Sequence, residues 1–174
     1  LKTYAESLEL SEEAGEYAVA AATRIQVGNT LYQCGENEAA LETYLYAAET
    51  LTAQEHLGMR AAVGVQIGQI YLEAKRHTEA EEQLEAAAAS AEQCGDLRNL
   101  LKAQMSLALA ARGQQVFEGG RQHYTAAAKT AAALGDVLEA ATIALLSGEL
   151  ERESGRPTQA LRHFRRARSY LNED

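Results

Sequence analysis

The stretch QVGNTLYQCG at residues 26–35 contains the first copy of a pattern that recurs with a 40-residue period. The first glycine of this stretch, Gly28, is followed at 40-residue intervals by residues that are all very small: Gly68, Ala108 and Gly148. A second column, twelve positions further on in each unit, is equally small: Ala40, Ala80, Gly120 and Ala160. Self-similarity at a fixed period of this length indicates a repeat architecture.

Two further columns share the same phase. Sixteen positions after the first column stand large side chains, Tyr44, Leu84, Tyr124 and Phe164, and nineteen after it stand four alanines, Ala47, Ala87, Ala127 and Ala167. Within one repeat these residues fall at helical spacing and form one apolar stripe on each helix. A glycine inside a helix costs up to about 1 kcal/mol relative to alanine, so its recurrence indicates a steric requirement where two helices cross.

Each repeat is therefore predicted to be helix, turn, helix, turn. Short breaks within the repeats are expected at residues 34–37, 75–78, 113–120 and 154–158, and breaks between repeats at Gly95-Asp96 and Gly135-Asp136. Glycine suits a left-handed helix end, aspartate can cap the following helix, and Pro157 suits a first helical turn.

The predicted organisation is one all-α domain of nine helices, with the repeats at 16–55, 56–95, 96–135 and 136–174. Residues 1–15 are interpreted as the second helix of a truncated repeat, because Tyr4 lies 40 before Tyr44 and Gly15 lies 80 before Gly95. Four helix pairs and one orphan helix result, and both ends of the sequence are expected to be cuts in, or at the limit of, a longer solenoid.

These columns resemble the tetratricopeptide repeat across nearly the whole chain. The first repeat carries the motif on Gly28, Gly35, Ala40, Tyr44 and Ala47, and the second and fourth repeats match at most of the same positions. The third departs from it, with Ala108, Gln115 and Gly120. The 40-residue period exceeds the family's usual 34 and resembles its longer-helix variant. The resemblance implies a right-handed α-α superhelix whose concave groove is lined by the first helix of each pair.

If the family's geometry holds, the groove residues are those on the first helices that point away from the packing stripe. They are predicted to be Ile25, Asn29, Tyr32, Gln33, Val65, Gln66, Gln69, Leu72, Lys102, Met105, Leu109, Arg112, Leu145, Glu149 and Arg152. This mixture of apolar, amide and charged groups suits an extended or helical peptide, and Asn29 could hydrogen-bond its backbone. The family's carboxylate clamp for chaperone tails is not expected, because Ile25, Gln66 and Ser106 occupy places that need other residues.

Composition and charge narrow the function classes. The net charge is −9, with 16 Lys and Arg against 25 Asp and Glu, which argues against nonspecific nucleic-acid binding. The acids concentrate in residues 1–55, which hold 10 acids and 2 bases. We expect no membrane insertion, since the sequence has no 18-residue uncharged apolar run.

No motif for catalysis, metal or cofactor binding stands out in the sequence. The cysteines Cys34 and Cys94 have no metal-ligand spacing and are interpreted as small buried thiols near helix ends. None of the four histidines has a second histidine or a cysteine at i+3 or i+4. The chain is therefore predicted to be non-enzymatic, without cofactor and without metal.

The leading functional hypothesis is a cytoplasmic scaffold that binds a partner protein or peptide in the concave groove. The alternative is a sensory or regulatory segment of a larger signalling or transcription-regulatory protein, or one that self-associates into a homo-oligomer through exposed end helices. The sequence leaves both hypotheses open.

Overall fold

The computed structural model describes residues 17–51 and 56–171, and every regular element within them is an α-helix. The eight helices are α2 (Tyr17–Gln33), α3 (Asn37–Thr50), α4 (Leu57–Glu73), α5 (His77–Cys94), α6 (Leu97–Gly113), α7 (Phe117–Leu134), α8 (Val137–Glu153) and α9 (Pro157–Leu171). The ninth helix, expected at residues 1–15, lies outside the described residues.

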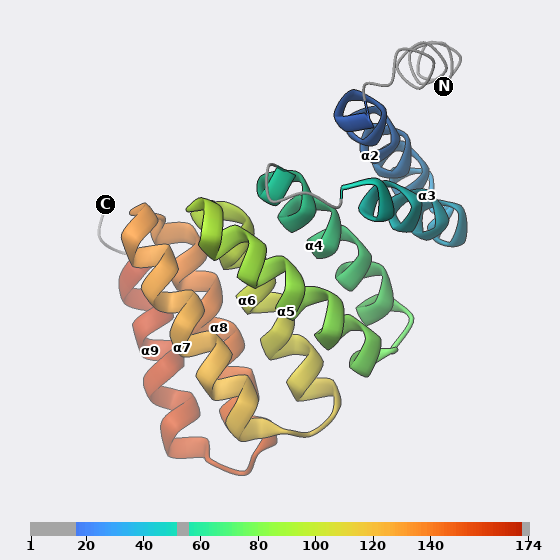
Figure 1. Cartoon of the computed structure of the whole chain (residues 1–174). Helices are drawn as coiled ribbons and strands as arrows, with labels where there is room; N and C mark the ends of the chain where they lie inside the picture. Colours follow the sequence, from blue (N-terminus) through green and yellow to red (C-terminus); the bar gives the residue numbers. More distant parts are fainter. Residues whose placement is uncertain (1–16, 52–55, 172–174) are drawn as a thin grey trace.

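The helices stack in chain order, from α2 and α3 at one end to α9 at the other (Figure 1). Each helix packs against the next along the chain, and α4 also packs against α6. We call α2, α4, α6 and α8 the first helices, and α3, α5, α7 and α9 the second helices. The predicted all-α helix-pair repeat is confirmed for the described residues.

Every turn from a first helix to a second helix contains a left-handed residue at the same register. These residues are Gly35, Lys75, Gln115 and Gly155, with φ between 59° and 80°. The amide that follows each one bonds back to a carbonyl five residues earlier, at 2.8–3.0 Å. That bond closes the helix end in the Schellman manner. Glycine adopts the left-handed conformation freely, whereas a residue with a Cβ pays roughly 1–2 kcal/mol for it.

The breaks between repeats are capped as predicted. Gly95 and Gly135 end their helices at φ 72° and 66°. The Asp96 carboxylate accepts the Asn99 amide at 3.1 Å, and the Asp136 carboxylate accepts from the next helix in the same way at 3.0 Å. These caps satisfy amides that would otherwise lack a partner at the helix start.

One predicted break is too long. The sequence suggested a turn over residues 113–120, but α6 ends at Gly113 and α7 already begins at Phe117. Gly119 and Gly120 are helical, and a Cβ on Gly120 would lie 3.1 Å from Leu150 Cδ1. The second glycine therefore serves close helix packing rather than chain reversal.

The predicted size columns meet at the crossing within each helix pair. A Cβ placed on Gly28 would lie 2.5 Å from Tyr44 Cε1, and one on Gly68 would lie 2.5 Å from Leu84 Cγ. On the last pair, a Cβ on Gly148 would overlap the Phe164 ring. In the third pair, Ala108 is fully buried in the same cluster as Tyr124. The four alanines of the fourth column, Ala47, Ala87, Ala127 and Ala167, are buried too, at 0–2% exposure.

One expectation about the surface is wrong. Cys34 and Cys94 are exposed free thiols, not buried ones, because the last turns that carry them face solvent. No helix among the described residues is long and apolar enough to cross a membrane.

Replacing Gly68 with leucine should destabilise the protein by about 1–3 kcal/mol, because the new side chain would have to displace Leu84 from a filled core. The matched control is Gly58→Leu near the start of α4, where an added Cβ has nothing within 4 Å. Urea unfolding followed by circular dichroism compares the two variants. Equal unfolding midpoints for the two variants would contradict the close packing of Gly68 against Leu84.

Candidate partner-binding face on the first helices

The first helices present a stripe of accessible side chains on the side opposite to their packing residues. On α8 the stripe runs through Leu138, Thr142, Leu145, Glu149 and Arg152, which lie three or four residues apart and therefore share one helix face. We call the corresponding accessible residues of all four first helices the first-helix face. Its predicted members there are Asn29, Tyr32, Gln33, Gln66, Gln69, Leu72, Lys102, Met105, Leu109, Arg112, Leu145, Glu149 and Arg152.

Two predicted groove residues do not belong to this face. Ile25 is 9% exposed, and Val65 is 0% exposed in a cluster with Ala87 and Ala103. On α2 and α4 the accessible residue is the one that follows, Gln26 and Gln66 respectively. On α6 and α8 the residues equivalent to Ile25 and Val65 are Met105 and Leu145, and both are accessible. The helices therefore turn slightly different faces outward, which a strict 40-residue step does not capture.

The half of the face on α2 and α4 is rich in side-chain amides. Tyr44 donates its hydroxyl to Asn29 Oδ1 at 2.6 Å, which fixes the amide plane. The Asn29 amino group has only a long 3.5 Å contact to Gln26 Oε1. Within the described part of the chain, no hydrogen bond engages the side chains of Gln33, Gln66 or Gln69. These amides retain donors and acceptors for a partner.

The half on α6 and α8 combines apolar and cationic groups. Lys102 is exposed, and Met105 and Leu109 are half-buried on the same face of α6. Leu145 on α8 is 45% exposed and Leu138 is 69% exposed. Exposed leucines aligned on one helix face are a typical anchor surface for a partner segment.

Polar bridges join the last turns of successive first helices. Tyr32 donates its hydroxyl to Glu73, which also accepts from Asn37 Nδ2 at 3.1 Å. Eighty residues on, Arg112 Nε donates to Glu153 Oε2 at 2.7 Å. Tyr32 and Arg112, both predicted groove residues, also join neighbouring first helices.

The acidic halves of both bridges were missed from the sequence. Glu73 and Glu153 are 80 apart in the chain, and each follows its bridging partner by one repeat plus one residue. Between them, position 113 is a glycine, covered by the ring of His77. Among the described residues, the middle step thus has no polar bridge between first helices. Instead, Gln114 Nε2 at the end of α6 donates to Glu81 Oε2 on α5 at 2.9 Å.

Hydrogen bonding and burial shift the ionisation of several groups near this face. The hydrogen bond that Tyr32 donates to Glu73, together with burial, raises the pKa of Tyr32 to about 12. Burial raises the pKa of Tyr44 and of Tyr124 to about 12 as well. The hydrogen bond from Arg112 lowers the pKa of Glu153, which keeps that bridge charged at neutral pH.

The described residues contain no cluster of three or more His, Cys, Asp or Glu that could hold a metal ion. Glu149 and Arg152 form an ion pair along α8. What the face offers chemically is hydrogen bonding through amides, apolar contact through leucine and methionine, and a cation at Lys102.

No family model and no curated protein matches this sequence. Solved structures do share its fold. BtubC (BKLC) from P. vanneervenii superposes with a TM-score of 0.79 at 16% identity, covering 97% of this chain and 71% of that one. MamA 41-end from Desulfovibrio magneticus RS-1 gives 0.72 at 17%, covering 99% and 97%.

A third similar structure is a Rap protein complexed with competence and sporulation factor, with a TM-score of 0.71 and 15% identity. That match covers 90% of this chain but only 43% of the Rap chain. The neighbours are helical repeat proteins of the tetratricopeptide type. The chain therefore has the tetratricopeptide-like fold that its sequence predicted.

Two equivalent tyrosines should respond oppositely to loss of their hydroxyl. Tyr44 donates its hydroxyl to Asn29, whereas Leu109 stands at the equivalent position near the buried Tyr124 hydroxyl. Arg112 lies near that hydroxyl, but no hydrogen bond of normal geometry forms there among the described residues. Tyr44→Phe should cost about 1 kcal/mol, and Tyr124→Phe should be neutral or stabilising. Chemical denaturation of both variants tests this, and equal losses would count against it.

Stability should fall as the pH rises from about 10 to about 12. The unfolded chain releases tyrosine protons near pH 10, whereas Tyr32, Tyr44 and Tyr124 hold theirs until about 12. Raised pKa values favour the folded state below that window, and the advantage is lost through it. Unfolding free energies measured from about pH 8 to pH 11 should decline, and less steeply for Tyr124→Phe. A flat profile would contradict the assignment.

Proposed function

We propose that this protein is an interaction scaffold that captures a segment of a partner protein on the first-helix face. The observation that carries the proposal is the set of unengaged amides on α2 and α4, together with the exposed Lys102 on α6 and Leu145 on α8. Polar groups left without internal partners on an accessible surface are available to a ligand.

The two halves of the face suit different parts of one segment. Side-chain amides such as Asn29 and Gln69 can satisfy the N–H and C=O groups of a bound backbone, as an added strand would. Met105 and Leu145 can bury an apolar side chain, and Lys102 favours a carboxylate nearby. The Rap protein provides a precedent, since a chain of this fold was solved in complex with competence and sporulation factor.

A regulatory role within a longer protein is the second candidate. The matched BtubC and Rap chains extend beyond the region that this chain covers, so the fold also occurs as part of larger proteins. In that case partner binding would act on a neighbouring domain, or end helices would pair two copies. Static light scattering between about 10 µM and 1 mM tests whether two copies pair, because self-association raises the apparent molecular mass with concentration and action on a neighbouring domain does not.

A photo-crosslinking residue at Gln69 should label the physiological partner, whereas the same residue at Glu85 on α5 should not. Both positions are accessible, but they lie on first and second helices respectively. Mass spectrometry of the adducts identifies the partner. Equal labelling from both positions would place binding elsewhere.

With the partner identified, Gln66→Ala, Gln69→Ala and Lys102→Ala combined should weaken its affinity by about tenfold or more, since each lost hydrogen bond contributes about 1 kcal/mol. The control combines three exposed second-helix positions: Glu82→Ala, Glu85→Ala and Gln122→Ala. Calorimetry compares both triple variants with the wild type. A control that loses as much affinity would overturn the assignment of the face.

A further inference from the structure

A cavity of about 200 Å³ opens on the other side of α8, between the second helices α7 and α9. Its floor is apolar and includes Ala140, Ile143, Ala144 and Leu150. These residues lie on the face of α8 opposite to Leu145 and Glu149, because each residue turns an α-helix by about 100°. The cavity is thus separate from the first-helix face.

The repeat geometry itself produces a hollow at this place. A smaller one, about 90 Å³, lies between α3 and α5 over α4. Seven of its eight lining residues lie 80 positions before a residue that lines the larger cavity: Ala48, Arg60, Val63, Gly64, Gln83, Ala86 and Ser90. The hollow is therefore generic, and what distinguishes the cavity at α9 is the set of side chains around it.

Four of the lining positions that differ from both earlier repeats carry a polar or a long side chain in place of an apolar or a short one. Ser147 stands where the chain has Ile67 and Leu107, and Glu151 stands where it has Tyr71 and Ala111. The other two are on α9, where Arg166 replaces Ala86 and Ala126, and Tyr170 replaces Ser90 and Thr130. Compared with the two earlier repeats, positions 147 and 151 are polar instead of apolar, and positions 166 and 170 carry long side chains instead of short ones. All four positions line the same cavity.

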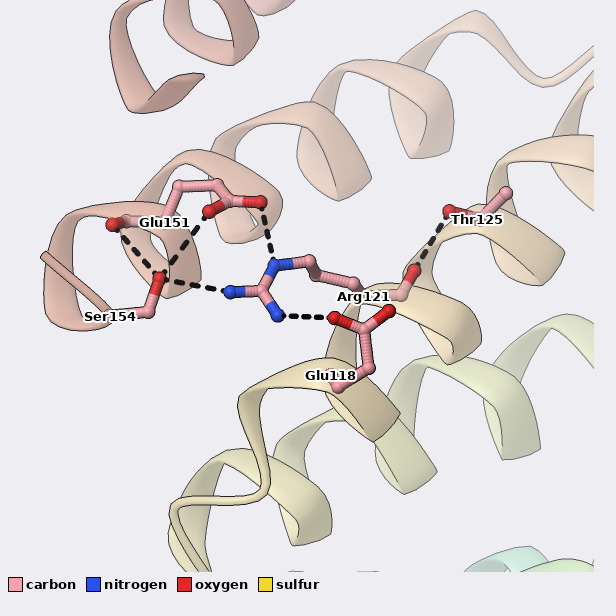
Figure 2. Close-up of polar contacts among 5 residues, drawn as sticks. All are labelled: Glu118, Arg121, Thr125, Glu151 and Ser154. Carbon is pink, nitrogen blue, oxygen red and sulfur yellow. Dashed lines mark hydrogen bonds and ion pairs between the residues drawn. The ribbon is translucent and has the colours of Figure 1, made fainter. Parts of the chain in front are cut away.

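Glu151 is 6% exposed and is held by a complete set of partners (Figure 2). Arg121 contacts it from Nε at 3.0 Å, bonds Ser154 Oγ at 3.3 Å and pairs with Glu118 at 2.8 Å. A buried ion pair is seldom more stable than an apolar pair of the same size. The cluster is thus not explained by stability alone, and it gives the α7 side of the cavity a rigid wall.

The α9 side supplies unengaged donors. Arg166 Nε bonds the Tyr170 hydroxyl oxygen at 3.0 Å, which leaves the hydroxyl hydrogen and the remaining guanidinium hydrogens for a ligand. No carboxylate pairs with Arg166 among the described residues. Helix α9 contains four arginines and no Asp or Glu, so this edge of the cavity is positively charged.

We propose that this cavity is a second docking site, for a partner-protein segment in which one apolar side chain is flanked by carboxylates. The apolar side chain lies on the floor formed by Ile143 and Leu150, and the carboxylate accepts hydrogen bonds from Arg166 and Tyr170. A volume of about 200 Å³ is below the roughly 300–1,000 Å³ of small-molecule sites and fits a single side chain. The charge of α9 selects an acidic segment.

The test uses blocked tripeptides and backbone amide NMR of the whole chain. Acetyl-Glu-Phe-Glu-amide should shift amides of α7, α8 and α9 around the cavity in a saturable way. Acetyl-Gln-Phe-Gln-amide and acetyl-Glu-Ala-Glu-amide should each bind about tenfold more weakly, because one lacks the charge and the other the apolar anchor.

Three variants locate the site. Arg166→Gln should weaken the Glu-Phe-Glu peptide by about tenfold, whereas Arg165→Gln, the same change one residue away and outside the cavity lining, should leave it unchanged. Ser147→Leu should abolish binding by filling the floor while retaining the fold, because Leu107 already occupies this register one repeat earlier.

Equal effects of Arg166→Gln and Arg165→Gln, shifts centred on the first-helix face, or no saturable shift would each overturn the proposal. Phenylacetate binding as tightly as the tripeptide would overturn the choice of a protein segment as the occupant. The Gln66, Gln69 and Lys102 triple variant should bind the tripeptide normally, so this site and the first-helix face are tested independently.

Discussion

The fold depends on one steric constraint, which is that each helix crossing needs a very small residue beneath a large one. Gly28 beneath Tyr44, Gly68 beneath Leu84 and Gly148 beneath Phe164 leave no room for even a single added carbon. Close packing of this kind sets the distance between the helices of a pair. The same crossing, repeated with the 40-residue period, stacks the pairs in order and exposes corresponding positions along the chain.

That constraint explains how far the sequence could predict the structure. Size columns, glycine helix ends and aspartate caps are all local, so they are visible in the chain itself. The turn predicted over 113–120 was too long because two adjacent glycines favour a loop in isolation, whereas Gly120 is helical and packs against Leu150 from a later helix. Contacts from distant residues override local propensity in this way.

The candidate site could be predicted only in part, for a related reason. A 40-residue step places Asn29, Gln69 and Leu109 correctly on the accessible face, yet it also placed Val65 there, which is 0% exposed. A small rotation of one helix about its axis moves the exposed position by one residue, and no pattern in the sequence reports that rotation. The partners of Tyr32 and Arg112 were missed because they lie one residue off the period.

Because the hollow between successive second helices is set by backbone stacking, its lining can vary without disturbing the columns that hold the fold. Most lining positions differ between the hollow over α4 and the cavity over α8, and the differences include those at 147, 151, 166 and 170, which add polar or long side chains. Apart from Tyr124, the residues that line the cavity over α8 are not members of the columns that hold the fold. A chain built like this can acquire a new specificity at one level of the stack while every other level keeps its own.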